Sequence, residues 1–243
     1  MSKEKLDGLL KSLVTKALKL EPQSDDAALV ASCHSKFGGP PYAEVGDTWP
    51  SCPTCKKELT FINQIHNEIE QQLFVFYYCN ECFPCGFGDE EKGQWIVKLY
   101  NEPSRSKIVE IDRISNDEFA PTPCMVITSI VEVLPDWEGI ASASEEVSEL
   151  CCKINDDSPW EEYEEAVERA GCLNDYATLL GGYPRFVQSE AGPACPECNS
   201  EMIFYAQVDS EDEANIMWGD VGLVYFFRCP VHKNQFQLEL QCH

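Results

Sequence analysis

The 243-residue sequence contains no run that approaches the roughly 20 consecutive apolar residues of a membrane-spanning helix. Its first twenty residues interleave lysines with leucines, so they also lack the continuous apolar core of a signal peptide. These two absences predict a cytoplasmic protein that does not bind membranes.

Basic residues are scarce as well. The 18 lysines and arginines face 42 aspartates and glutamates, which leaves a formal charge of −24. A surface this acidic repels phosphate groups, so we expect no binding of nucleic acid or anionic lipid. A basic protein is the natural electrostatic partner, although solubility alone is an equally simple explanation of the charge.

Sequence motifs of catalysis are absent too. There is no phosphate-binding loop, no G-x-S-x-G nucleophile turn and no H-E-x-x-H helix. His34 directly follows Cys33, but neighbouring residues rarely face each other productively. We therefore predict a protein that is not an enzyme. An enzyme with a site in a cleft between two halves, and a purely structural module, stay open as alternatives.

Cysteine is abundant: the chain has 14. In a reducing compartment, cysteines at regular spacing indicate metal ligands before disulfides. Four pairs have the required spacing of two intervening residues. The first two pairs are separated by 23 residues and the last two by 30, and they comprise Cys52, Cys55, Cys79, Cys82, Cys195, Cys198, Cys229 and His232.

An internal repeat relates the two sets. A Gly-Gly turn at residues 37–41 recurs at 180–184, and a Cys-Pro-x-Cys knuckle follows thirteen residues after the second glycine in both places. Phe61 and Gln64 match Phe204 and Gln207 at the same offset of 143 residues. After a length difference the offset becomes 150, where Phe74, Phe76 and Cys79 match Val224, Phe226 and Cys229.

The repeat predicts the fold class: α+β, internally duplicated, with two similar mostly-β halves that carry zinc-ribbon-like knuckles. Each half should contain a strand (58–65 or 201–208), an aromatic strand (72–78 or 221–228) and a third strand with alternating apolar residues. Further strands are expected at 108–111 and 124–133. The expected divisions are 1–30 (N-terminal helix and linker), 31–135 (first half), 136–178 (acidic helical connector) and 179–243 (second half).

Two helices complete the expectation. Leucines and alanines at helical spacing predict an amphipathic helix over residues 3–20. In the connector, Ser158-Pro159-Trp160-Glu161 has the pattern of a helix start with a capping box, and Gly171 is a plausible end. The glutamates of this second helix should form a solvated face, with a docking surface as the less favoured alternative.

The spacing of the cysteine pairs predicts two structural zinc ions, because two knuckles supply the four ligands of a tetrahedral site. One set would be all thiolate, and the other would combine three thiolates with the His232 imidazole. Cys85 could replace a ligand of the first set, and Cys242 or His243 one of the second. Loss of the metal from one half is a further alternative. A redox role is disfavoured, because a redox Cys-x-x-Cys opens a helix whereas these knuckles precede strands.

Three segments of the first half resemble the YwqG-like bacterial family of unknown function. They are residues 35–42, Trp49-Pro50 before the first knuckle, and Leu59-x-Phe61-x-x-Gln64. Residues 179–184 with Gln188 resemble that family's second signature. More distantly, the order of motifs is similar to the programmed cell death protein 2 family, whose members act as chaperones for a basic ribosomal protein. The YwqG-like resemblance implies an α+β fold and a toxin-immunity role. Both resemblances imply binding of one protein partner.

Overall fold

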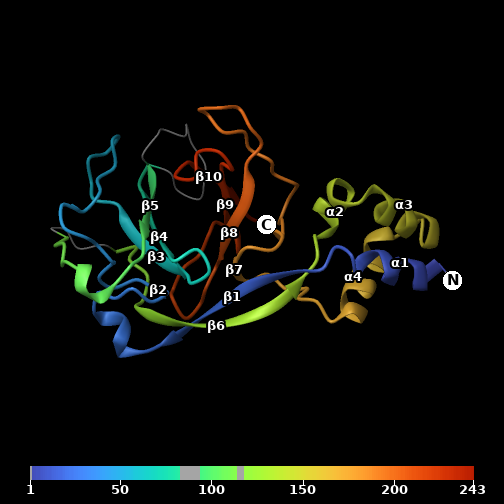
Figure 1. The fold of residues 1–243 in the computed structure, drawn as a ribbon, viewed down its shortest axis with the longest axis horizontal. Coiled ribbons are helices and arrows are strands. Elements are labelled where there is room, and N and C mark those ends of the chain that lie inside the picture. The colour runs from blue at the N-terminus through green and yellow to red at the C-terminus, as the bar shows by residue number, and fades with distance from the viewer. Residues whose placement is uncertain (1, 83–93, 114–117) are drawn as a thin grey trace. The chain divides into compact units, whose positions relative to one another are not determined.

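A computed structural model describes residues 2–82, 94–113 and 118–243. The described residues form four α-helices and ten β-strands (Figure 1). They divide into two compact units. Unit 1 comprises Met1–Leu20, Thr128–Asp209 and Gly222–His243, and unit 2 comprises Glu21–Ile127 and Ser210–Val221.

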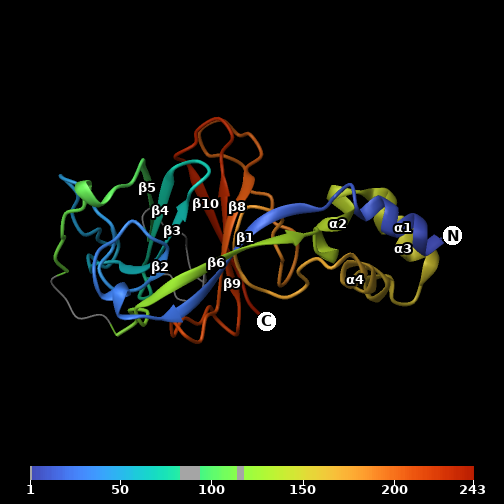
Figure 2. The same ribbon diagram turned by 60° about the horizontal axis from the view of Figure 1, so that its bottom comes forward.

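All four α-helices lie in unit 1 and pack together as one cluster (Figure 2). They are α1 (Ser2–Leu10), α2 (Trp137–Ala143), α3 (Glu145–Ile154) and α4 (Pro159–Ala170). Leu6, Leu10, Val147 and Tyr163 are among the buried side chains that hold the cluster together. The N-terminal helix and the acidic helix are thus present, and the acidic connector contains three helices rather than one.

The strands of unit 1 form an antiparallel series in the order β10 (Phe236–Gln241), β9 (Leu223–Arg228), β8 (Ile203–Asp209), β7 (Thr178–Leu180) and β1 (Thr15–Ser24). A buried cluster on this series includes Phe186, Tyr225 and Phe227 together with Cys195 and Cys229. Two of the four residues of the second set, Cys195 and Cys229, therefore belong to the apolar core of their unit.

The helix predicted over residues 3–20 is wrong beyond Leu10. Strand β1 begins at Thr15, and Leu18 lies opposite Leu180 in the ladder with β7. Ala17 and Leu20 are buried there. Their apolar spacing suits a helix locally, but pairing with β7 supplies a ladder that the isolated sequence does not reveal.

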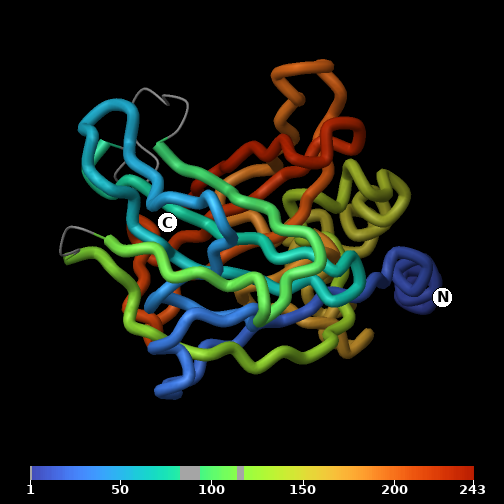
Figure 3. The backbone as a smooth tube through the Cα atoms, turned by 60° about the vertical axis from the view of Figure 1, so that its left-hand side comes forward, coloured from blue at the N-terminus to red at the C-terminus, as the bar shows by residue number. Residues whose placement is uncertain are grey.

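Unit 2 contains the strands β2 (Lys36–Phe37), β3 (Thr60–Asn67), β4 (Gln72–Tyr78) and β5 (Trp95–Asn101), with the first residues of β6 (Cys124–Val133). They pair in the antiparallel order β6-β2-β3-β4-β5, and Figure 3 shows β3 to β5 as neighbouring cyan and green tubes. Two short 3-10 turns flank them, η1 (Asp26–Leu29) and η3 (Arg105–Lys107). One face buries Tyr42, Leu59 and Tyr77 with Cys52 and Cys79.

The strands of both predicted halves are present within a few residues of the expected bounds, and β6 has the expected bounds 124–133. The strand predicted at 108–111 is wrong. Those residues follow the turn η3 without entering a ladder, and one backbone bond, from Val109 N to Ala43 O at 2.9 Å, anchors them. Their β-branched residues pack as an irregular segment, with Ile108 against the core of unit 2.

Several backbone and side-chain bonds recur between the units at the offset of 143. Gln64 Oε1 accepts from Tyr42 N at 2.8 Å, and Gln207 Oε1 accepts from Arg185 N at 2.9 Å. Both amides are fully buried and also donate to a carbonyl, that of His34 (2.7 Å) or Ala177 (2.8 Å).

The Gly-Gly turns also recur at the offset of 143 residues. Gly38 and Gly181 have φ of 55° and 73°, in the left-handed region that glycine adopts without strain. Their N–H groups donate to Ile62 O (3.0 Å) and Tyr205 O (2.8 Å), the positions where β3–β4 and β8–β9 each shift register.

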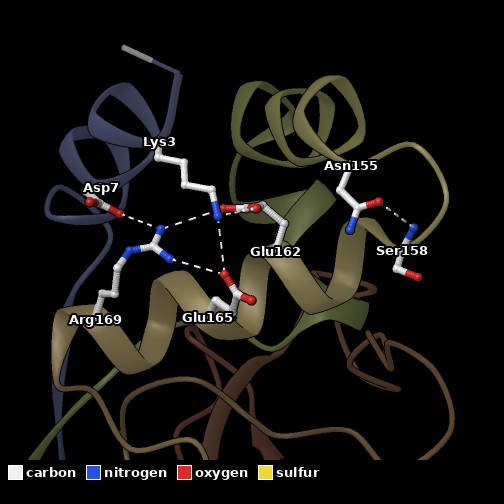
Figure 4. Close-up of polar contacts among 7 residues, drawn as sticks. All are labelled: Lys3, Asp7, Asn155, Ser158, Glu162, Glu165 and Arg169. Atoms are coloured by element: carbon white, nitrogen blue, oxygen red, sulfur yellow. Dashed lines mark hydrogen bonds and ion pairs between the residues drawn. The ribbon is translucent and has the colours of Figure 1, made fainter.

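The acidic helix α4 is not a uniformly solvated face. Glu162 is 5% exposed, and its carboxylate pairs with Lys3 at 2.8 Å and Arg169 at 3.7 Å (Figure 4). Glu165 joins the same network. The other glutamates of the helix, at 161, 164 and 168, are exposed. One turn of the predicted acidic face therefore fixes α1 to α4.

The ends of α4 are partly as predicted. Gly171 ends the helix in the left-handed conformation, as expected. The predicted capping box is wrong, because the Ser158 side chain forms no cap bond. Instead Asn155 Oδ1 accepts from Ser158 N at 3.1 Å and closes the turn before the helix (Figure 4).

Candidate metal centres

The structure brings the first predicted set together in unit 2. The sulfur atoms of Cys52, Cys55, Cys79 and Cys82 all lie within 4.8 Å of one another. The knuckle of Cys52 and Cys55 precedes β3, whereas Cys79 directly follows β4. Cys55 Sγ and Cys79 Sγ are 3.8 Å apart, which is the separation of two ligands that share one ion rather than of a disulfide.

The knuckle has a defined backbone. Cys52 N donates to Lys57 O at 2.8 Å, and Lys56 N donates back to Cys52 O at 3.0 Å. Lys56 takes a positive φ of 63° to close this turn. These bonds place both sulfurs of the knuckle on one side of the loop.

The second set comes together in unit 1 from the corresponding places. The ligand atoms of Cys195, Cys198, Cys229 and His232 lie within 4.8 Å of one another. Cys198 Sγ is 3.6 Å from Cys229 Sγ, and Cys195 Sγ is 3.7 Å from His232 Nδ1. The knuckle turn repeats the first one: Cys195 N donates to Ser200 O at 2.9 Å, and Asn199 has a φ of 56°.

A carboxylate stands beside the second set and not in the corresponding place of the first. Glu197 Oε2 lies 3.5 Å from His232 Nδ1, and its Oε1 accepts from Gln235 Nε2 at 2.5 Å. The corresponding residue of the first knuckle is Thr54. Glu197 therefore places a negative group beside the same ring nitrogen, Nδ1, that lies 3.7 Å from Cys195 Sγ.

The thiols of each set differ in acidity. Burial opposes ionisation of Cys52, but the N–H groups of Cys55 and Thr54 and the neighbouring thiols lower its pKa to about 7. Burial raises the pKa of Cys79 to about 12. The second set shows the same directions, with the pKa of Cys195 lowered and that of Cys229 raised. Backbone donors thus favour a thiolate at the first cysteine of each knuckle, and a cation would be needed to ionise the buried cysteine after the strand.

Both sets could hold a metal ion. Each offers four soft or borderline donors, which is the donor set of a closed tetrahedral site. Cys85, the alternative ligand of the first set, lies outside the described residues. Cys242 and His243 belong to neither set: Cys242 O accepts from Gln188 Nε2 at 2.7 Å, and the His243 ring lies 5.9 Å from Tyr176.

Three of the cysteines outside the two sets have the environment of inert thiols. Cys124, Cys151 and Cys172 are buried, and burial raises the pKa of each. A raised pKa lowers the fraction of reactive thiolate at neutral pH.

Comparison with known proteins places these sites in a family. Residues 35–233 match the "Domain of unknown function (DUF1963)". The chain belongs to this family. All eight candidate ligands of this DUF1963 chain fall inside the matched range. The match does not separate the YwqG-like family from others, so that resemblance stays a prediction.

One curated relative of the DUF1963 chain is "Uncharacterized protein YpfL" of Salmonella typhimurium (strain LT2), 41% identical over 51 residues. The similarity covers 21% of this chain and 12% of YpfL. Within the described residues, no helix combines the length and apolar character needed to cross a membrane.

Proposed function

We propose that each cysteine set binds one structural zinc ion. Zinc is the metal that four-coordinate sites of thiolates, with or without one imidazole, favour. The observation that supports the proposal is the convergence of four ligand atoms within 4.8 Å at two separate places. With four protein ligands, neither ion would keep an open position for water, so a hydrolytic role is not proposed.

The role of the ions would be to hold the fold. Each set joins a knuckle before one strand to the end of the next, across the β3–β4 or β8–β9 pair. Binding of zinc would therefore couple directly to folding of that pair. Elemental analysis of protein purified without chelator should find about two zinc ions per chain, and chelation should destabilise both units.

We also propose that the two cysteine-bearing regions descend from one duplicated ancestor. The support is that buried glutamine bonds, Gly-Gly turns, knuckle turns and strand register shifts recur at one offset. Two unrelated antiparallel sheets can have the same strand order. They are not expected to have the same glutamine-to-backbone hydrogen bond at the same position of the sequence.

Finally, we propose that the protein is a non-enzymatic binder of a basic protein partner, of the toxin-immunity or client-chaperone type. The charge of −24 is the observation that supports it. Exposed carboxylates remain on α4 after Glu162 and Glu165 have formed ion pairs. A row of carboxylates at Glu161, Glu164 and Glu168 suits long-range attraction of a cationic surface.

Affinity capture from the source cell at low and high salt tests this binder. We expect a specific basic protein that is retained at low salt and lost at high salt, because salt screens exposed charges. A variant with Glu161, Glu164 and Glu168 changed to Gln should retain less of it. Capture of no basic protein at either salt would contradict the proposal.

A further inference from the structure

Unit 1 contains a cavity of about 250 Å³ beside the second cysteine set. Its floor includes Phe204 and Phe227, which pack in the same apolar cluster as Cys195 and Cys229. Its walls come from α2 and from the segment 183–191. Asp136 fixes these walls, because its carboxylate accepts from the N–H groups of Gly139 and Phe186. The cavity is therefore a formed feature of the unit.

The aromatic floor has a counterpart in unit 2. Phe204 and Phe227 form an edge-on pair with ring centroids 6.1 Å apart. At the corresponding positions, Phe61 and Tyr77 form a pair 5.6 Å apart. In unit 2 the half-buried Trp49 covers this pair, 5.9 Å from Tyr77 and almost perpendicular to it.

In unit 1 the residue that corresponds to Trp49 is Gly192. A Cβ atom built on Gly192 would meet no atom within 4 Å, so the space beside it is open. The neighbouring Ala191 lines the cavity. Unit 1 thus keeps the aromatic floor but lacks the indole that rests on it in unit 2.

In unit 2, Trp49 forms a hydrogen bond and a contact with a cationic side chain. The indole Nε1 donates to Leu59 O at 2.8 Å, and the Arg113 guanidinium lies 5.5 Å from the ring centroid. Glu58 pairs with that arginine at 3.8 Å. In unit 1, Met202 and the exposed Glu201 take the places of Leu59 and Glu58. Unit 1 therefore keeps the carboxylate at this position, as Glu201.

Size and charge narrow the class of occupant. The volume is below the roughly 300–1,000 Å³ of pockets that hold whole small molecules, and it suits one large side chain. The rim carries Glu190, whose carboxylate accepts from Ser142 Oγ at 2.5 Å. An aromatic group with a neighbouring cation would match both the apolar floor and the acidic rim.

The geometry points to a recognition pocket for an aromatic side chain, best a tryptophan, with an arginine or lysine beside it on a partner polypeptide. The inference rests on the proposed function as a binder of a basic protein, and it adds the anchor residue that such a partner would insert. A buried aromatic anchor in a pocket is the usual centre of a protein interface.

The test titrates the zinc-containing full chain with N-acetyl-Trp-Arg-amide and follows the methyl signals of labelled alanines. We expect Ala143 and Ala191, which line the cavity, to shift, and Ala28 of unit 2 not to shift. N-acetyl-Trp-Glu-amide should bind at least about threefold more weakly, because the rim is acidic. Equal shifts with N-acetyl-Leu-Arg-amide, or none with the tryptophan peptide, would overturn the inference.

Two variants sharpen the test. Gly192→Trp should fill the pocket with the protein's own indole and weaken peptide binding about tenfold or more. Gly8→Trp places the same side chain in equally open space on α1 and should leave binding unchanged. If Gly192→Trp does not fold, the comparison of peptides on the unmodified chain still decides.

The outcome is separable from that of the partner proposal. Peptide binding without capture of any basic protein would support the recognition pocket and contradict the proposed basic partner. If the Gly192→Trp variant captures as much of the basic protein as the unmodified chain, the partner is supported and the role of the pocket in binding it is overturned.

Discussion

The two cysteine-bearing regions are alike at the positions that hold the backbone and different at the positions around them. Both keep the knuckle turn, the Gly-Gly turn and the buried glutamine. They differ at three pairs of corresponding positions: Trp49 corresponds to Gly192, Lys36 to Leu179, and Cys82 to His232. The shared positions therefore define the framework, and the differing ones are where each region acquires its own chemistry.

The largest effect is expected from breaking one metal set at a time. Cys79→Ser should remove one zinc ion and destabilise its unit by about 4 kcal/mol or more, because a buried ligand and the closure of two loop ends are lost together. Cys229→Ser should do the same in unit 1. Metal counting and thermal unfolding measure both effects.

His232→Ala should cost no more than Cys79→Ser, since Cys79 is buried in the core at the end of β4 whereas the His232 side chain is 37% exposed. Cys152→Ser serves as the control, because Cys152 is exposed and belongs to neither set. Retention of two zinc ions by Cys79→Ser would show that another cysteine, such as Cys85, substitutes for it.

The second test makes unit 2 resemble unit 1. Trp49→Gly should open a space over Phe61 and Tyr77 and lower the free energy of unfolding by about 3 kcal/mol, the range for loss of a large aromatic side chain. Added indole should restore part of this loss, as measured by the shift of the unfolding midpoint. No restoration at any indole concentration would argue that the two aromatic floors are not equivalent.

Lys36 offers a pH-dependent contrast. Its ammonium is fully buried and donates to Ala28 O (3.0 Å) and Val30 O (2.8 Å), and burial lowers its pKa to about 8. The unfolded chain keeps this proton up to about pH 10.5, so the folded state is penalised below pH 8 and relieved as the pH rises from 8 to 10.5. The relief is at most about 3 kcal/mol.

Lys36→Leu, which introduces the residue of unit 1, should remove this rise. Denaturant unfolding of the variant and of the unmodified chain at pH 8 and pH 10 measures how much the free energy of unfolding changes with pH in each. The titration of the cysteines contributes equally to both proteins, so the difference between them reports on Lys36. Identical pH dependence of the two proteins would contradict the assigned burial of the amine.

The buried glutamines give the smallest difference. Gln64 forms hydrogen bonds with Tyr42 N, Ser32 O and His34 O. Among the described residues, Gln207 forms hydrogen bonds with Arg185 N and Ala177 O. Each alanine substitution should cost about 2 kcal/mol, and Gln64→Ala the more, since buried backbone groups lose their partners. Gln23→Ala, at an exposed position of β1, is the matched control for chemical denaturation.

The cysteine sets and most strands could be predicted because their signals are local. Two-residue spacing and alternation carry the information within a few positions, as at Cys52 and Cys55 or in β4. The strand β1 could not, because its ladder depends on β7, far away in the sequence. The cavity cannot be predicted from the sequence either, because its lining comes from α2, from residues 183–191 and from the strands β8 and β9, which are far apart in the chain.

The central claim is that both regions hold the same kind of metal site, and the metal content of the purified chain tests it most directly. Native mass spectrometry of protein prepared without chelator, compared with the protein after denaturation in acid, reports the number and mass of bound ions. Two zinc ions per chain, reduced to one in both Cys79→Ser and Cys229→Ser, is the expected result. A chain free of metal with all thiols reactive would contradict the account.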